Sequence, residues 1–262
     1  MVSLSFNVIG INATISERSN KYLNIESLKY SKGLISLNCS ARSVNGNISA
    51  LENLTLLKDL NLQFSNISGD INSLKNLTAL TFFNINNTQV SGNISNLNNL
   101  TALTGLNLGN TQVSGDINAL NNLTALTGFN IFNTNTPIIG SINSLSGLSK
   151  LLTAQIKYSQ LSGDLATLPA SCRFISFQND AGSTFTWGTR SSSAKIIAIE
   201  GNASLTNIDK MLQDQAQCQI GFTSSDIVAY KTISVAGNRT SASDDAVATL
   251  QQKGYTISIE KA

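Results

Sequence analysis

The chain contains no histidine, and this absence excludes several kinds of chemistry. Histidine is the commonest general base and the commonest metal ligand in proteins. Nucleophilic catalysis by a Ser–His or Cys–His pair is therefore excluded within this chain. The three cysteines, Cys39, Cys172 and Cys218, form no CxxC pair, so the sequence predicts no thiolate metal site. Cys39 and Cys172 fall where the repeat places a leucine, so we expect cysteines that serve as small core residues. We expect no enzyme activity, cofactor or metal.

Charged residues are also scarce, at 12% of the 262 residues, about half the average of globular proteins. The 17 basic and 15 acidic residues give a net charge of +2, and the basic ones form no run. We therefore expect neither nucleic-acid binding nor attachment to an anionic membrane. Serine and asparagine interrupt every apolar run well before the roughly 18 residues of a membrane-spanning helix. The N-terminal residues also lack the basic start and unbroken apolar core of a secretory signal, which predicts a soluble protein that is not exported by that route.

A repeat is the main feature of the sequence. Residues 74–96 (LKNLTALTFFNINNTQVSGNISN) and 97–119 (LNNLTALTGLNLGNTQVSGDINA) are nearly identical, and residue 120 begins another copy. The opening leucines are separated by 23, 23, 23, 23, 25 and 23 residues. They are Leu28, Leu51, Leu74, Leu97, Leu120, Leu145 and Leu168. The glycines that keep the same period are Gly46, Gly69, Gly92, Gly115, Gly140 and Gly163. A fixed period of about 20–29 residues with L-x-x-L-x-L spacing predicts a solenoid whose stacked strands form a parallel sheet.

Within each copy, two apolar positions predict the inward side of a strand, because side chains alternate along a strand. These pairs are Leu60/Leu62, Phe83/Ile85, Leu106/Leu108, Phe129/Ile131, Ala154/Ile156 and Ile175/Phe177. Three residues later the copies carry a hydroxyl, which we expect to satisfy buried backbone groups at a bend. These residues are Ser65, Thr88, Thr111, Thr134 and Ser159, with Arg42 departing from the pattern in the first copy.

The segments after the bend, such as Val113–Ile117 (VSGDI) and Leu161–Leu165 (LSGDL), resemble the L-x-G-x-I half of plant-type leucine-rich repeats, without the proline that usually follows. The resemblance covers about 155 residues and implies an α/β leucine-rich-repeat solenoid, a horseshoe with a concave parallel sheet and a second short sheet beside it. The Asn/Thr-rich style is similar to that of bacterial and bacteriophage leucine-rich-repeat proteins. That likeness implies a virion surface or a bacterial cytoplasm as the location.

Three regions are predicted. Residues 1–27, where Leu4, Phe6 and Val8 alternate with polar residues, predict a cap strand, with a strand for attachment to a larger assembly as the alternative. Residues 28–183 form the repeat array, whose one irregularity is the insertion TNTPIIG around Pro137. Residues 184–262 predict β-α turns continuous with the solenoid. Strands are expected at 195–200, 232–236 and 255–260. Helices are expected at 204–217, capped by Ser204, and at 243–253, capped by Ser243, with Val247 and Leu250 inward and Gly254 at the end.

The residues between the inward pairs are expected on the concave face. The candidate binding residues are Asn61, Gln63, Phe82, Asn84, Asn107, Asn130, Phe132, Gln155 and Lys157. An amide row flanked by phenylalanines suits sugars and peptide backbones, which offer donors, acceptors and apolar faces. The same amides can instead stabilise the sheet by hydrogen bonding along it, and both interpretations stay open. A second row, Asp70, Asp116 and Asp164, permits calcium binding, but the neutral residues between its members favour a solvated face.

Two functions fit these patterns. The first is a non-catalytic recognition module that binds a protein or a surface glycan, one version being a phage adhesin that binds host cells. The second is a structural component of a phage tail or capsid, as a homo-oligomer or as part of a virion assembly. Fold by itself implies neither function.

Overall fold

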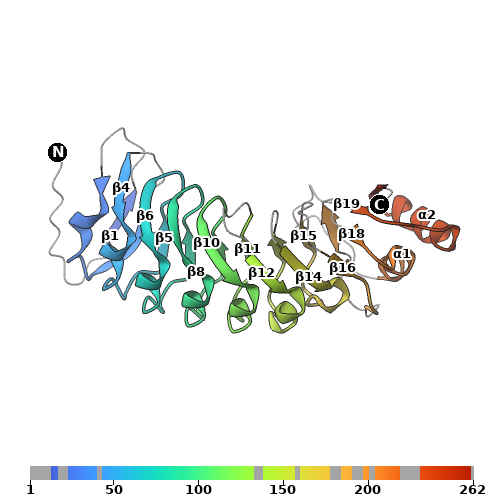
Figure 1. The fold of residues 1–262 in the computed structure, drawn as a ribbon, viewed down its shortest axis with the longest axis horizontal. Helices are drawn as coiled ribbons and strands as arrows, with labels where there is room; N and C mark the ends of the chain where they lie inside the picture. The colour runs from blue at the N-terminus through green and yellow to red at the C-terminus, as the bar shows by residue number, and fades with distance from the viewer. Residues whose placement is uncertain are drawn as a thin grey trace. The chain divides into compact units, whose positions relative to one another are not determined.

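The structure, a computed structural model, describes residues 13–16, 23–39, 43–132, 138–156, 160–177, 184–190, 197–200, 204–218 and 231–260 (Figure 1). The chain forms two compact units, Met1–Ile138 and Ile139–Ala262. The strand predicted from Leu4 to Val8 and the insertion at residues 133–137 lie outside the described residues. No helix in the described part of the chain has both the length and the apolar character that a membrane crossing requires.

Each turn of the first unit contributes one strand to a first parallel sheet. The strands of this sheet are β1 (Ala13–Ser16), β3 (Leu34–Asn38), β5 (Asp59–Asn61), β7 (Phe82–Asn84), β9 (Gly105–Asn107) and β11 (Gly128–Asn130). Each pairs in parallel with the equivalent strand of the next turn. The register follows the 23-residue period, since Leu60 pairs with Phe83 and Phe83 with Leu106.

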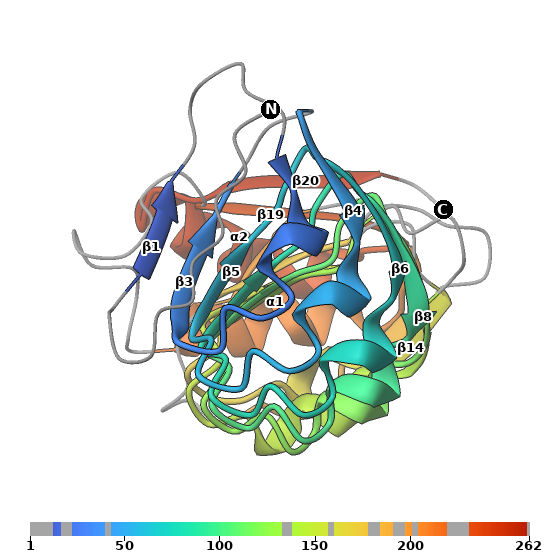
Figure 2. The ribbon, with the colours of Figure 1, turned by 90° about the vertical axis from the view of Figure 1, so that its left-hand side faces the viewer.

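The glycine-containing half of each turn forms a second parallel sheet, as the resemblance implied. Its strands are β2 (Leu23–Asn24), β4 (Val44–Asn47), β6 (Asn66–Asp70), β8 (Gln89–Asn93) and β10 (Gln112–Asp116). Viewed along the stack, β3 and β5 lie on one side of the turns and β4, β6 and β8 on the other (Figure 2). A 3₁₀ helix completes each turn. These helices are η1 (Ile25–Leu28), η2 (Ile48–Leu51), η3 (Ile71–Leu74), η4 (Ile94–Leu97) and η5 (Ile117–Leu120).

The core of each turn consists of the apolar positions that the repeat predicted. All six predicted inward pairs are buried, and Leu60 and Leu62 are 0% exposed. Cys39, Cys172 and Cys218 are buried and free, so the prediction that they serve as small core residues is confirmed. Burial of a leucine side chain contributes about 1.5–3 kcal/mol. One turn cannot bury its own edges, so this contribution depends on the neighbouring turns.

The hydroxyls at the bend have the role that the sequence predicted. The side chains of Ser65, Thr88 and Thr111 are buried and donate to the carbonyl oxygen three residues earlier, at 2.5–2.7 Å. Each bond satisfies a carbonyl group where the first strand ends. The equivalent residues Thr134 and Ser159 lie outside the described residues, as does Arg42.

The aspartates of the second sheet are helix caps. The carboxylate of Asp70 accepts from the N–H of Asn72 at 2.7 Å, and Asn47 and Asn93 accept in the same way in the adjacent turns. Asp116 and Asp164 cap η5 and η7 (Leu165–Thr167). A glycine of the next turn leaves room for such a cap: Gly115 has a φ of 119°, and a Cβ there would lie 2.5 Å from Oδ1 of Asn93. Asp and Asn are therefore interchangeable acceptors at this position.

The second unit contains two sets of parallel paired strands, which we call ladders, and both pair with one strand, β19 (Thr232–Ala236). One contains β12 (Ile138–Ser141), β14 (Gln160–Asp164), β16 (Thr184–Thr186) and β18 (Ser204–Leu205). The other contains β13 (Thr153–Gln155), β15 (Phe174–Ser176) and β17 (Ala198–Glu200). Both β17 and β18 pair with β19, which also pairs with β20 (Thr256–Glu260). The unit also contains η6 (Ile142–Gly147), η7 and η8 (Ser241–Ser243).

The boundaries of the two α-helices differ from those predicted. Helix α1 (Ile208–Gln217) begins at Ile208, so the cap predicted at Ser204 is wrong. Ser204 and Leu205 form β18 instead, where Leu205 pairs with Phe185 and is buried. Burial of that leucine contributes about 1.5–3 kcal/mol, which outweighs the roughly 1 kcal/mol that a serine cap contributes.

Helix α2 (Asp244–Gln252) follows Ser243, the predicted cap residue. The hydroxyl of Ser243 does not cap the helix; it donates to Oδ1 of Asp209 at 2.6 Å. Leu250 is buried as predicted, Val247 is half-buried, and Gly254 follows the helix with a φ of 85°.

Candidate recognition surfaces

The outward face of the first sheet brings most of the predicted binding residues together. Asn61, Asn84, Asn107 and Asn130 come from four neighbouring strands and pair in register. Gln63 and Phe132 lie two residues beyond the ends of β5 and β11, and Phe82 begins β7. Gln155 belongs to the second unit, where it pairs with Ser176, and Lys157 lies outside the described residues.

The side-chain oxygen atoms of the asparagine row have a structural role. Oδ1 of Asn61, Asn84, Asn107 and Asn130 accepts from the backbone N–H two residues later, at 3.1–3.3 Å. Asn side chains commonly form such local turns, and here they end the strands. Nδ2 of Asn84 donates to Oε1 of Gln63 at 3.1 Å, across the turns. Nδ2 of Asn107 donates to no described residue, so it remains a donor at the half-buried surface.

Two phenylalanines lie over glycines of the turn that carries Asn107. A Cβ on Gly105 would lie 2.9 Å from Cδ2 of Phe82, and one on Gly109 would lie 2.7 Å from Cε1 of Phe132. Only glycine leaves space for the rings at these two positions. We call Phe82, Gly105, Asn107, Gly109 and Phe132 the aromatic bracket. It combines two ring surfaces with one amide donor between them.

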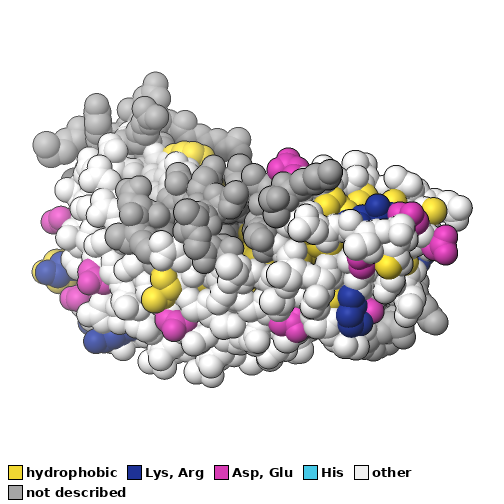
Figure 3. Space-filling model, turned by 45° about the vertical axis from the view of Figure 1, so that its right-hand side comes forward, with side chains coloured by type: hydrophobic (Ala, Val, Ile, Leu, Met, Phe, Trp, Pro, Cys, Tyr) yellow, Lys and Arg dark blue, Asp and Glu magenta, His cyan; other side chains and the backbone are white. Residues whose placement is uncertain are grey.

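The aromatic bracket is partly exposed, and its residues carry no charge. Phe82 is 38% exposed, and Phe132 is half-buried. A charged side chain next to it is that of Asp59, which pairs with Phe82 in the neighbouring strand. Charged side chains are also few and scattered over the face of the molecule in Figure 3. The bracket therefore suits a ligand that is neutral where it touches the rings.

A second surface lies at the corner where each turn leaves the first sheet. Three residues at this corner have left-handed backbone: Phe64 with φ 58°, Asn87 with φ 57° and Asn110 with φ 51°. Asn tolerates this region, whereas a bulky residue there is an outlier that costs about 1–2 kcal/mol. Phe64 is nevertheless 52% exposed, so burial of its ring offsets little of that cost.

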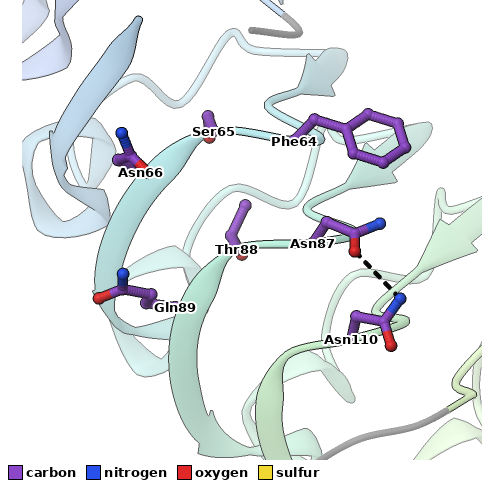
Figure 4. A pocket seen from close by; sticks show the side chains of 7 residues that line it. All are labelled: Phe64, Ser65, Asn66, Asn87, Thr88, Gln89 and Asn110. Carbon is purple, nitrogen blue, oxygen red and sulfur yellow. Dashed lines mark hydrogen bonds between the residues drawn. The ribbon is translucent and has the colours of Figure 1, made fainter. Parts of the chain in front are cut away.

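A groove of about 410 Å³ runs along this corner. We call it the corner groove (Figure 4). It is lined by Phe64, Ser65, Asn66, Asn87, Thr88, Gln89 and Asn110. Nδ2 of Asn110 donates to Oδ1 of Asn87 at 3.1 Å, which continues the amide contacts from turn to turn. Phe64 was not among the predicted binding residues, although alignment of the repeats places it at the position that Asn87 and Asn110 occupy in the next two turns.

The described residues offer little reactive chemistry. Burial raises the pKa of the Cys172 thiol to about 11, so this thiol stays protonated at neutral pH. Burial also raises the pKa of the Cys218 thiol. No group of three or more His, Cys, Asp or Glu side chains within the described ranges is placed to hold a metal ion. The surfaces described above are suited to binding.

Comparison with known proteins finds solved structures that share this fold. No protein-family model matches the chain, and no curated protein matches it. Among solved structures, an internalin from Listeria monocytogenes is 20% identical with a TM-score of 0.62, over 95% of this chain and 66% of that one. The plant peptide hormone receptor RGFR1, in complex with RGF2, is 19% identical with a TM-score of 0.63, over 95% of this chain and 44% of that one. A TDR receptor is 17% identical with a TM-score of 0.69, over 96% of this chain and 43% of that one.

These likenesses establish the fold. The chain is a leucine-rich-repeat solenoid with two open parallel sheets, as its period predicted. It spans 66% of the length of the internalin chain and less than half of the two receptor chains.

Proposed function

We propose that this chain is a non-catalytic recognition module that binds an extended peptide segment of a protein partner on the first sheet, at the aromatic bracket. The observation that carries the proposal is the placement of two rings, the exposed Phe82 and the half-buried Phe132, on either side of Asn107. Aromatic side chains supply large, rigid contact surfaces and are enriched among the residues that dominate binding energy.

The dimensions suit an extended peptide. Gly105 and Gly109, beneath the two rings, are four residues apart, which corresponds to at most about 13 Å at roughly 3.3 Å per residue. Apolar side chains at positions i and i+4 of an extended peptide lie on one face at the same separation. The Nδ2 group of Asn107 is placed to donate to a peptide carbonyl between them.

Similar folds in other proteins support a peptide ligand. Besides RGFR1 with RGF2, the structures with this fold include the receptor kinase HAESA in complex with an IDA peptide hormone and a PEPR1–AtPEP1 complex. Each of these is at most 22% identical to this chain, so the support concerns what the fold accommodates.

The test is selection from a displayed library of random linear peptides, followed by calorimetry on the selected sequences. We expect enrichment of peptides with apolar residues four positions apart, and Phe82→Ala with Phe132→Ala to weaken binding about tenfold or more. Leu56→Ala is the control, because Leu56 is 54% exposed and lies outside the bracket. Selection of no peptide, or equal affinity for the double variant, would show that the proposal is wrong.

Two more specific proposals concern the larger particle in which the chain acts. Host-cell attachment by a phage particle is tested by competition between the purified chain and phage for host cells. The alternative, a structural component of an assembly, is tested by light scattering and by deletion of residues 1–12. A discrete oligomer that is lost on deletion supports assembly, and a monomer in both cases supports a recognition module.

A further inference from the structure

The corner groove contains a residue that the fold does not require. Phe64, Asn87 and Asn110 are equivalent in three successive turns and share the left-handed backbone. Asn is suited to that conformation and Phe is not. The Phe64 ring is 52% exposed, so it does not serve the core either. Residues held in sparsely populated backbone regions cluster at binding sites, and this one lies in a groove.

The chemistry of the corner groove is neutral and amide-rich. Its lining residues carry no charge. The Phe64 ring lies at one end of the groove, on the same side as Asn87 and Asn110 (Figure 4). The exposed side chains of Asn66 and Gln89 lie at the other end. Primary amides offer both donors and acceptors, as hydroxyl groups do. A pyranose ring presents an apolar C–H face together with a rim of hydroxyl groups, which matches an aromatic wall bordered by amides.

The backbone at this corner is already engaged. The N–H groups of Phe64, Asn87 and Asn110 donate to carbonyls of the following turn at 2.8–2.9 Å. A peptide that bound here by strand addition would find these donors occupied. Recognition at the groove therefore rests on side chains. The absence of Lys, Arg and carboxylates from the lining also disfavours an anion or a metal ion.

We propose that the corner groove is a binding site for a neutral glycan, separate from the aromatic bracket. One pyranose ring stacks on Phe64 and bonds to the amide of Asn87, and the following sugar units of the chain reach the amides of Asn66 and Gln89 at the other end of the groove.

The experiment uses the full chain, labelled with nitrogen-15, and four neutral probes: maltohexaose, cellohexaose, chitohexaose and mannohexaose. We expect at least one probe to shift the side-chain amide signals of Asn87 and Gln89. Phe64→Asn is the test variant. It installs the residue that the next two turns carry, so it should fold, and we expect it to weaken binding about tenfold or more.

Leu56→Asn is the matched control, since it removes a side chain of similar exposure, 54%, and should leave glycan binding unchanged. The proposal is wrong if no probe shifts the groove signals at about 10 mM, a concentration that detects even millimolar affinity. It is also wrong if Phe64→Asn binds as tightly as the parent chain. Peptide binding at the aromatic bracket does not involve Phe64, so the two proposals fail independently.

Discussion

The indole Nε1 of Trp187 donates a hydrogen bond of 3.0 Å to Oδ2 of Asp214. Trp187 is 0% exposed, and the carboxylate also accepts from the backbone N–H of Arg190 and from Nζ of Lys210. One carboxylate of α1 thus holds the segment that follows β16. The bond satisfies a buried donor whose loss of partner is costly.

Asp214→Ala should therefore lower the free energy of unfolding by about 1–3 kcal/mol, because it leaves the indole N–H buried without an acceptor. Urea unfolding followed by fluorescence measures this change, since Trp187 is the single tryptophan of the chain. Gln217→Ala, at an exposed position of the same helix, should change stability by less than about 0.5 kcal/mol. Equal effects of the two variants would contradict the role given to Asp214.

Phe64→Asn should raise the free energy of unfolding by about 1 kcal/mol, because Asn tolerates the left-handed backbone at φ 58°. The reciprocal change Asn87→Phe should lower it by a similar amount, since it places a bulky residue at φ 57° and removes the amide bond from Asn110. Thermal unfolding of the two variants gives the comparison. A loss of stability in Phe64→Asn would mean that ring contacts outweigh backbone strain.

Gly109→Ala should displace the Phe132 ring, because the added Cβ would lie 2.7 Å from Cε1 of that ring. The single variant should lose about 1–3 kcal/mol, and the loss should be smaller when Phe132→Ala is also present. A double-mutant cycle on the free energy of unfolding measures this coupling. Additive effects would show that the ring does not rest on Gly109.

Asp70→Ala should cost about 1 kcal/mol through loss of the η3 cap, whereas Asp70→Asn should be nearly neutral. Asn47 and Asn93 perform the same function in adjacent turns, so the amide oxygen is a sufficient acceptor. Thermal unfolding with and without calcium separates the two interpretations of this row. A calcium-dependent rise in melting temperature that Asp70→Asn abolishes would favour a metal site.

Asp209 should make the free energy of unfolding decrease at acidic pH. Burial raises the pKa of this carboxyl group, but hydrogen bonds from Ser243 and Thr240 and the charge of Arg239 outweigh it, and the net pKa lies below its ordinary value. A lowered folded-state pKa contributes stability above the unfolded value of about 4, and this is lost as pH falls through the folded value. Asp209→Asn should therefore be less stable at pH 7 and less sensitive to acid. Parallel stability profiles for the two proteins below about pH 4 would contradict this.

The repeat period was enough to predict the fold, because a leucine recurring every 23 residues can be buried in every copy only if the copies stack. The outward residues followed from strand alternation, as for Asn61 and Asn84. The orientation of a ring was not predictable, since the packing of Phe82 on Gly105 depends on rotamers across turns. The positive φ at Phe64 is not expected from phenylalanine itself, and only the asparagines at the equivalent positions Asn87 and Asn110 indicate it. Similarly, Ser204 has the residue type of a cap, and only the pairing of its strand with β16 shows otherwise.

The pairing of both ladders with β19 limits where repeat copies can be gained or lost in evolution. In the first unit every turn presents the same two strands to its neighbours, so an in-frame duplication or loss of one copy would leave matching surfaces on either side. At β19 the two ladders share one strand, and among the described strands only β20 follows. A copy inserted there would find no second ladder to join. The number of repeats should therefore vary among related proteins before β19, while the segment from β19 to β20 keeps a constant length.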